Sequence, residues 1–296
     1  MSKLQVVDPH FHLWDTASGN YPWLETPSTG FSGDNTLIAR SYLIDEFLAE
    51  ASAVELLKAV FVEAIATDPL AETAYNQEVA DGPGKGLPHG IVAYCDLSAP
   101  DAAQQLEALA AHANLRGIRQ ILNVHDNSFF TYVKRQFMHE PAWQQGFRLL
   151  RRHNLSFDLQ LYPKQMPAAA ALAAANPETP IILNHAGMWV DRTLTGWREW
   201  RDGMRLLAAH DNVHVKISGL GMLDHQWKAG SIRPLVLETL DAFGPGRAMF
   251  ASNFPVDKLY SDYGAIWNAF ADIVADLSGP EKAALFRGNA ERVYRI

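Results

Sequence analysis

Near the N-terminus, residues 6–15 read VVDPHFHLWD, and this stretch is the most informative in the chain. An apolar segment leads into two histidines, His10 and His12, at the end of an expected strand. Side chains two apart in a strand point to the same side, so the two imidazoles share one face. Two neutral imidazoles on one face suit a divalent metal ion or a polarised water. A His-x-His pair alone is also compatible with two surface or core histidines.

Short apolar runs rich in Val, Ile and Phe recur along the whole chain, with helix-like segments between them. Continuously apolar runs are typical of a parallel sheet that is covered on both faces. We expect strands at 4–8, 59–65, 89–95, 116–122, 155–161, 181–185, 213–218 and 248–252. We expect helices at about 42–57, 70–80, 100–113, 140–153, 165–175, 196–210, 231–243 and 263–277. Alternating strands and helices predict an α/β protein, a single (β/α)8 TIM barrel, with a doubly wound open sheet as the competing fold.

No repeat or linker divides the chain, so residues 1–296 are expected to form one domain. Residues 14–41 follow the first strand and contain NYPWLETPSTGFSGDN, a stretch rich in Gly, Pro, Ser and aromatic residues. In a barrel, loops after strands lie on the catalytic face. The stretch 14–41 is therefore either a long active-site loop over the substrate pocket or a surface excursion.

Composition excludes several classes of protein. The formal charge is −8 and no Lys/Arg-rich run occurs, which argues against nucleic acid as a partner. The lone Cys95 rules out an intrachain disulfide and a cysteine-based zinc site. The N-terminus lacks the apolar core of a signal peptide, and no apolar run reaches the roughly 18 residues that span a membrane. We therefore expect a cytoplasmic protein without a membrane partner, and the sequence is compatible with a homo-oligomer.

Charged and polar residues end several other predicted strands. His185 ends IILNH and adds a third imidazole to the pair already described. Lys216, in VHVKISG, binds an anionic substrate group or a developing oxyanion, or else it lies on the barrel exterior. Arg119, in GIRQIL, carries a guanidinium that suits a substrate carboxylate. Glu63, in VFVEAI, is either an acid in the pocket or the partner of a basic residue.

The last strand runs AMFASNFPVD and brings two further candidates, Asn253 and Asp257. An amide donates and accepts hydrogen bonds but takes no proton as a general base. Asp257 is the nearby carboxylate that would act as a base at this strand end.

These motifs together resemble the amidohydrolase-related barrels that include sugar-acid lactonases and 2-pyrone-4,6-dicarboxylate lactonase. The resemblance rests on blocks that occur in the family's order along the whole chain: VDPHFHLWD, YPWL, RGIRQIL, LSFDLQL, ILNHAG, VHVKISGL, GPGRAMFASNFPVD and FRGNAERVYRI. It implies a (β/α)8 barrel that opens cyclic esters with water. His10, His12 and His185 match the family's strand-end histidines, and Lys216 matches the lysine of its KxSG block.

One departure from the resemblance concerns the eighth strand. Many relatives have Ser-Asp-Trp-Pro there, with the Asp as general base, whereas residues 252–255 read Ser-Asn-Phe-Pro. Either Asp257, a histidine or a metal-bound hydroxide takes over the proton transfer, or the reaction differs. Some members of the family use a divalent metal, here zinc or manganese held by His10, His12 and His185, and catalysis without a metal stays open.

The leading hypothesis is a hydrolase that opens a small lactone, a sugar-acid or carboxylated cyclic ester, with a histidine-activated or metal-activated water. His10, His12, His185, Asn253 and Asp257 would form the catalytic group. Binding of the lactone or carboxylate substrate would fall to Lys216, Arg119 and Glu63. The alternatives are a metal-dependent decarboxylase of an aromatic acid, and a catalytically impaired ligand-binding barrel, because Asn253 replaces the usual aspartate.

Overall fold

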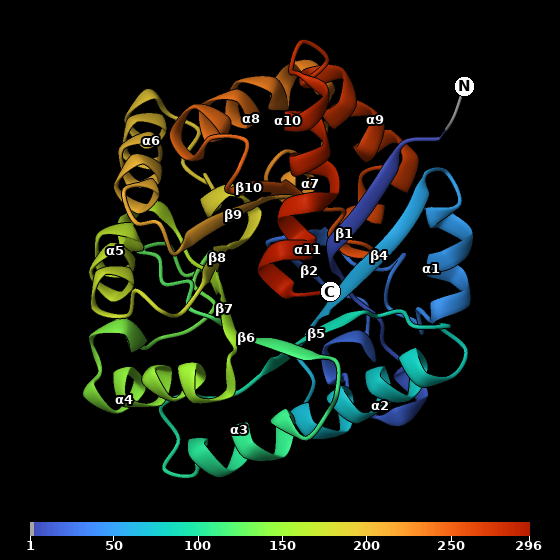
Figure 1. Cartoon of the computed structure of the whole chain (residues 1–296), viewed down its shortest axis with the longest axis vertical. Helices are drawn as coiled ribbons and strands as arrows, with labels where there is room; N and C mark the ends of the chain where they lie inside the picture. The colour runs from blue at the N-terminus through green and yellow to red at the C-terminus, as the bar shows by residue number, and fades with distance from the viewer. Residues whose placement is uncertain (1–2) are drawn as a thin grey trace.

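Eight parallel strands form one sheet in the order β1-β4-β5-β6-β7-β8-β9-β10 in the computed structural model, which describes residues 3–296. The sheet curls until its first and last strands meet. The His12 N–H donates to the Phe254 carbonyl at 2.7 Å, and the Asn253 N–H donates to the His10 carbonyl at 2.8 Å. Helices surround this ring of strands (Figure 1). The predicted (β/α)8 barrel is therefore confirmed, and the open doubly wound sheet is wrong.

The elements lie close to their predicted positions. The barrel strands are β1 (Gln5–Phe11), β4 (Glu55–Val62), β5 (Gly90–Tyr94), β6 (Leu115–Ile121), β7 (Ser156–Gln160), β8 (Ile181–Leu183), β9 (Val213–Ile217) and β10 (Ala248–Phe250). The helices are α1 (Ile44–Ala51), α2 (Pro69–Asp81), α3 (Ala102–Ala110), α4 (Pro141–Leu149), α5 (Met166–Ala175), α6 (Leu194–Ala208), α7 (Leu220–Leu223), α8 (Ala229–Phe243), α9 (Tyr263–Ile273), α10 (Gly279–Ala283) and α11 (Asn289–Tyr294). The helix expected over 42–57 ends at Ala51, because β4 already begins at Glu55.

The stretch 14–41 contains more local structure than the sequence suggested. It holds two short 3-10 turns, Thr16–Ser18 and Pro22–Leu24, and a small antiparallel ribbon of β2 (Thr29–Gly30) and β3 (Gly33–Asp34).

The C-terminal helix α11 lies across the N-terminal ends of the strands, where it appears near the centre of the ring in Figure 1. Lys58 in β4 donates to the Ile296 carbonyl at 2.9 Å, and Asn289 donates to the Ala248 carbonyl at 2.7 Å. Tyr294 packs into the barrel interior with apolar side chains of the strands, which are Val7, Val60, Val62, Val92, Ile182 and Met249. This end of the barrel is therefore filled.

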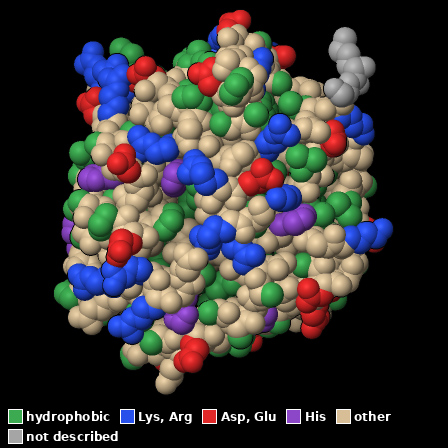
Figure 2. All heavy atoms as spheres, in the orientation of Figure 1, with side chains coloured by type: hydrophobic (Ala, Val, Ile, Leu, Met, Phe, Trp, Pro, Cys, Tyr) green, Lys and Arg blue, Asp and Glu red, His purple; other side chains and the backbone are tan. Residues whose placement is uncertain are grey.

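Lys and Arg side chains lie scattered over this filled end, with Asp and Glu among them, as Figure 2 shows. Within residues 3–296, no helix combines the length and apolarity needed to cross a membrane.

An irregularity in β1 determines which way its histidines point. Val7 packs inside the barrel, whereas Phe11 packs in the outer core between strands and helices. Residues four apart in a regular strand share a face, so the strand must change phase between them. The pairing of β1 with β4 does shift register between Asp8 and Phe11, which is the behaviour of a β-bulge. With Phe11 outside, His10 and His12 face the barrel interior.

Candidate active site

The three strand-end histidines meet at the C-terminal end of the barrel. The ring centroid of His10 lies 5.0 Å from that of His12 and 4.8 Å from that of His185. All three side chains are buried. Although His185 lies far from the other two in sequence, the closed barrel brings β1 and β8 to the same interior, and their C-terminal ends face the same side.

Neighbouring groups leave ring nitrogens of these histidines free for other ligands. The Nδ1 of His12 lies 2.7 Å from the Val62 carbonyl, so it carries the proton and leaves Nε2 as a lone pair. The Nδ1 of His185 lies 3.0 Å from the Ser218 hydroxyl. Both ring nitrogens of His10 are buried without a hydrogen-bond partner. An unpartnered buried imidazole is unusual, and here it points to a ligand site.

Burial also keeps the three rings neutral. It lowers the pKa of His12 to about 3, and it lowers the pKa values of His10 and His185 well below the ordinary value. The positive charges of Arg119 and Lys216 act in the same direction. Neutral imidazole is the form that binds metal ions.

His185 sits in a backbone turn that ordinary side chains avoid. His185, Ala186, Gly187 and Met188 all have positive φ, at 54°, 48°, 71° and 48°. Left-handed backbone costs roughly 1–2 kcal/mol per non-glycine residue, and such strain gathers at functional sites. Gly219 makes room for the ring, since a Cβ there would lie 2.5 Å from the His185 Nδ1. The local backbone is therefore shaped around this one imidazole.

A pocket of about 280 Å³ opens beside the histidines. His12, His185 and Asn253 line it, whereas Asp257 does not. The stretch 14–41 contributes a large part of the wall through Trp14, Trp23, Phe31, Ser32 and Ile38. Strand ends and later loops supply the rest: Ala64, Ile65, Arg119, Ile121, Tyr132, Gln160, Met188, Met222 and Val256.

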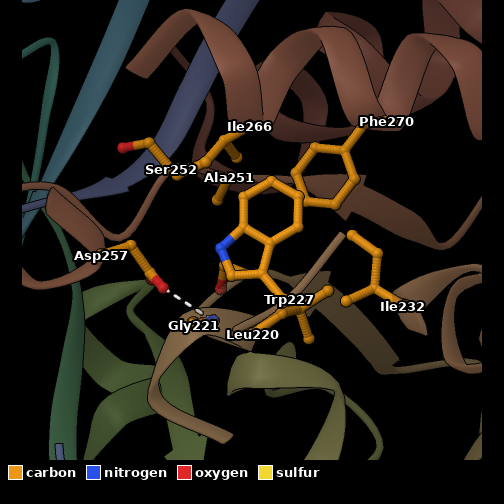
Figure 3. Close-up of a pocket in the computed structure, with 11 residues that line it drawn as sticks. Leu220, Gly221, Trp227, Ile232, Ala251, Ser252, Asp257, Ile266 and Phe270 are labelled. Carbon is orange, nitrogen blue, oxygen red and sulfur yellow. Dashed lines mark hydrogen bonds between the residues drawn. The ribbon is translucent and has the colours of Figure 1, made fainter. Parts of the chain in front are cut away.

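Asp257 lies behind Asn253 and holds it in place. Its Oδ2 accepts from the Asn253 Nδ2 at 2.8 Å, and its Oδ1 accepts from the Gly221 N–H at 2.9 Å. Figure 3 shows the carboxylate directed at Gly221, in a separate small cavity beside the Trp227 indole. Burial raises the pKa of Asp257 to about 7. The structure thus places this carboxyl group against the Asn253 amide and outside the lining of the main pocket.

Lys216 is completely buried in the barrel interior. Its Nζ lies 2.5 Å from the Asp158 Oδ1, and the Tyr294 hydroxyl and the Asn184 amide also donate to that carboxylate, at 2.9 and 3.0 Å. Burial lowers the pKa of Lys216, and Asp158 opposes that change. Lys216 does not line the main pocket, and it is not on the barrel exterior.

Arg119 does line the pocket, and three of its N–H donors are engaged by the protein. Its Nε donates to the Glu63 Oε1 at 2.6 Å, and one terminal nitrogen donates to the Glu63 carbonyl at 2.5 Å. The other terminal nitrogen lies 3.3 Å from the Gln160 Oε1. Of the two interpretations of Glu63, the ion pair with a basic residue is the one present in the structure.

Three residues that contact the site were not singled out from the sequence. Asp158 in LSFDLQL carried a usable signal, because a charged residue in an apolar strand is costly to bury without a partner. The same reasoning had drawn attention to Lys216. Ser218 and Gln160 are ordinary polar residues at strand ends, and only the folded contacts distinguish them.

The donors available to a metal ion are imidazoles and one amide. Within residues 3–296, no three or more His, Cys, Asp or Glu side chains are arranged as a ready-made metal site. The chemistry of the histidines nevertheless fits such an ion, since the three buried, neutral rings lie close together and both nitrogens of His10 have no hydrogen-bond partner.

Comparison with known proteins agrees with this architecture. The model of a protein family described as amidohydrolase matches residues 7–296. The chain belongs to the amidohydrolase family. The family assignment made from the sequence blocks is confirmed, and the protein is a hydrolase.

Individual relatives within the family cover the chain from end to end. An uncharacterised protein of Sinorhizobium fredii is 48% identical over 302 residues, with 100% of each chain covered. An L-fucono-1,5-lactonase of Burkholderia ambifaria is 29% identical, with 98% of this chain and 95% of that protein covered. A crystal structure of an amidohydrolase from Burkholderia multivorans with bound zinc has a TM-score of 0.82 at 28% identity, covering 99% of both chains.

Proposed function

We propose that this protein hydrolyses a small lactone with a water molecule activated beside His10, His12 and His185. The observation that carries the proposal is the meeting of three neutral imidazoles at the C-terminal end of the barrel, where two of them, His12 and His185, line the pocket. The similarity to L-fucono-1,5-lactonases over nearly the whole chain supports lactone opening as the reaction.

A divalent ion would be held by His10, His12 and His185, and the zinc-bound relative supports zinc as the first choice. When bound, such an ion would supply a water of lowered pKa, about 7, and a Lewis acid for the ester carbonyl. His12 and His185 each direct Nδ1 to a protein oxygen, which fixes the ring and leaves Nε2 available.

Asn253 would orient the attacking water and take no proton. Its Nδ2 is engaged by Asp257, so the amide oxygen is the atom left to accept a hydrogen bond in the pocket. Asp257 would act as a positioning residue that keeps the amide from turning over. Water adds to the lactone carbonyl, the ring C–O bond breaks, and the product is a hydroxy acid that releases one proton at neutral pH.

Purified protein with measured metal content should release protons from 1,5-lactones, followed with a pH indicator. Removal of metal by a chelator should abolish this activity, and zinc or manganese should restore it. Substitution His185→Ala should lower kcat/KM by more than the roughly 10- to 100-fold typical of residues that only support a metal ligand. The matched control is His139→Ala, since His139 is exposed and lines no part of the pocket.

Absence of lactone turnover with every metal loaded would contradict the proposal. Release of carbon dioxide from a hydroxybenzoate would then favour the decarboxylase. Hydrolysis that appears only after Asn253→Asp would favour a barrel that has lost catalysis.

A further inference from the structure

The wall of the main pocket is predominantly apolar above the histidines. Large hydrophobic side chains from the 14–41 stretch and from strand ends form it, among them Trp14, Trp23, Phe31, Ile38 and Ile121. A polyhydroxylated ring placed against such a wall loses its hydrogen bonds to water and gains few in return.

The two tryptophan indole N–H groups of this wall are satisfied by the protein. The Trp14 indole N–H donates to the Arg40 carbonyl at 2.7 Å, and the Trp23 indole N–H donates to the Ala64 carbonyl at 2.9 Å. Both tryptophans therefore offer only their ring surfaces to a ligand. Away from His12, His185 and Asn253, the remaining polar side chains are Ser32, Tyr132, Gln160 and Arg119.

The positive charge in the pocket is also paired within the protein. Among the described residues that line it, Arg119 is the single cation, and it forms a buried ion pair with Glu63 at 2.6 Å. A substrate with several carboxylates would meet no free positive side chain there. The wall thus selects against both polyhydroxylated and polycarboxylated rings.

Ile65 gives an independent indication. It is β-branched, yet its φ is +60°, a conformation that such residues rarely adopt. Its side chain lines the pocket and is 39% exposed, so internal packing does not account for it. The Glu63 carboxylate accepts from its N–H at 2.7 Å and holds the turn. Strain of this kind gathers at functional positions. An exposed isoleucine side chain in a pocket is suited to contact an apolar part of a ligand.

We propose that the substrate is a lactone with an alkyl or aryl substituent in place of ring hydroxyls, the substituent lying against this apolar wall. The inference rests on the proposed lactone hydrolysis and narrows its substrate class. Each hydroxyl left without a partner is expected to lower kcat/KM about 5- to 150-fold.

The test compares 1,5-lactones that share ring size: δ-valerolactone, δ-nonalactone with its butyl substituent, and L-fucono-1,5-lactone. Each kcat/KM is divided by the rate constant of hydroxide hydrolysis, which removes differences in intrinsic reactivity. We expect the normalised value for δ-nonalactone to exceed that for the sugar lactone at least tenfold. An equal or higher value for the sugar lactone would overturn the inference.

Binding separates failure of this inference from failure of the proposed function. If no lactone is hydrolysed, calorimetry with non-hydrolysable lactams still tests the pocket. Tighter binding of 6-butylpiperidin-2-one than of a polyhydroxylated lactam would support the apolar substrate class. Tighter binding of the polyhydroxylated lactam, or no binding of either, would overturn it.

The variant Ile65→Asn tests the wall itself. Asparagine tolerates positive φ, so the variant should fold, while the wall becomes more polar. The preference for δ-nonalactone over δ-valerolactone should fall at least threefold. The control is Leu194→Asn, because Leu194 is 79% exposed and lies outside the pocket. An unchanged preference in Ile65→Asn would count against the inference.

Discussion

Replacement of Asp257 by asparagine should change how the stability of the protein depends on pH. Burial raises the pKa of this carboxyl from 3.8 to about 7, even though hydrogen bonds from Asn253 and Gly221 act in the opposite direction. Between these two pKa values the folded protein holds a proton that the unfolded chain releases. The corresponding stability is present at low pH and is lost as the pH rises through about 7.

The size of this effect follows from the two pKa values. Between pH 5 and pH 8, the contribution of Asp257 to the free energy of unfolding should fall by roughly 2.5 kcal/mol. The Asp257→Asn variant has no carboxyl to titrate there, so this part of the pH dependence should vanish. Other buried acids, such as Glu72, titrate equally in both proteins and cancel in the difference.

Urea unfolding at pH 5, 6, 7 and 8 measures the free energy of unfolding of both proteins. The free energy of unfolding of the wild type, minus that of the variant, should decrease as the pH rises from 5 to 8. Asp276→Asn, at an exposed aspartate, is the control and should show a constant difference. Parallel curves for wild type and Asp257→Asn would refute the argument, because they would mean that Asp257 titrates at its ordinary pKa.

Two further substitutions test the supporting contacts of the site. Lys216→Met leaves the buried Asp158 carboxylate without its cation, so the free energy of unfolding measured in urea should fall by about 3–5 kcal/mol. A fall of less than about 1 kcal/mol would contradict the buried ion pair. Ser218→Ala removes the hydroxyl 3.0 Å from the His185 Nδ1 and should lower metal affinity or kcat about 10- to 100-fold, with only about 1 kcal/mol lost in stability. Unchanged metal binding and kcat in Ser218→Ala would show that His185 needs no such support.

The barrel strands were predictable from the sequence to within a few residues because each is a short apolar run between helix-like segments. The helix boundaries were less predictable from the sequence. The helix over 42–57 was drawn too long, since Glu55–Leu57 read as part of an amphipathic helix until pairing with β1 drew them into β4. The sequence did not predict the short helices α7, α10 and α11, and α11 owes its place to contacts with strand ends.

The types of residue at the site also followed from the sequence. A histidine pair at period two and a histidine ending an apolar run are local patterns, so His10, His12 and His185 could be selected without coordinates. Asn253 stood out at the eighth strand only through the resemblance to the family, because relatives carry an aspartate at that position.

What each charged side chain does was decided by the tertiary structure alone. Lys216 and Arg119 were expected to meet a substrate, and Glu63 was expected to be either a pocket acid or the partner of a basic residue. In the structure Lys216 pairs with Asp158, and Arg119 lines the pocket while it pairs with Glu63. A buried charge is stable only beside an opposite charge, and its partner is chosen by which strands the closed barrel places side by side. A sequence pattern predicts which face of its own strand a side chain lies on. The residue that pairs with it from another strand depends on how the barrel closes and on the register of the strands. The same holds for Asp257, whose carboxyl group contacts the Asn253 amide and lies outside the pocket lining.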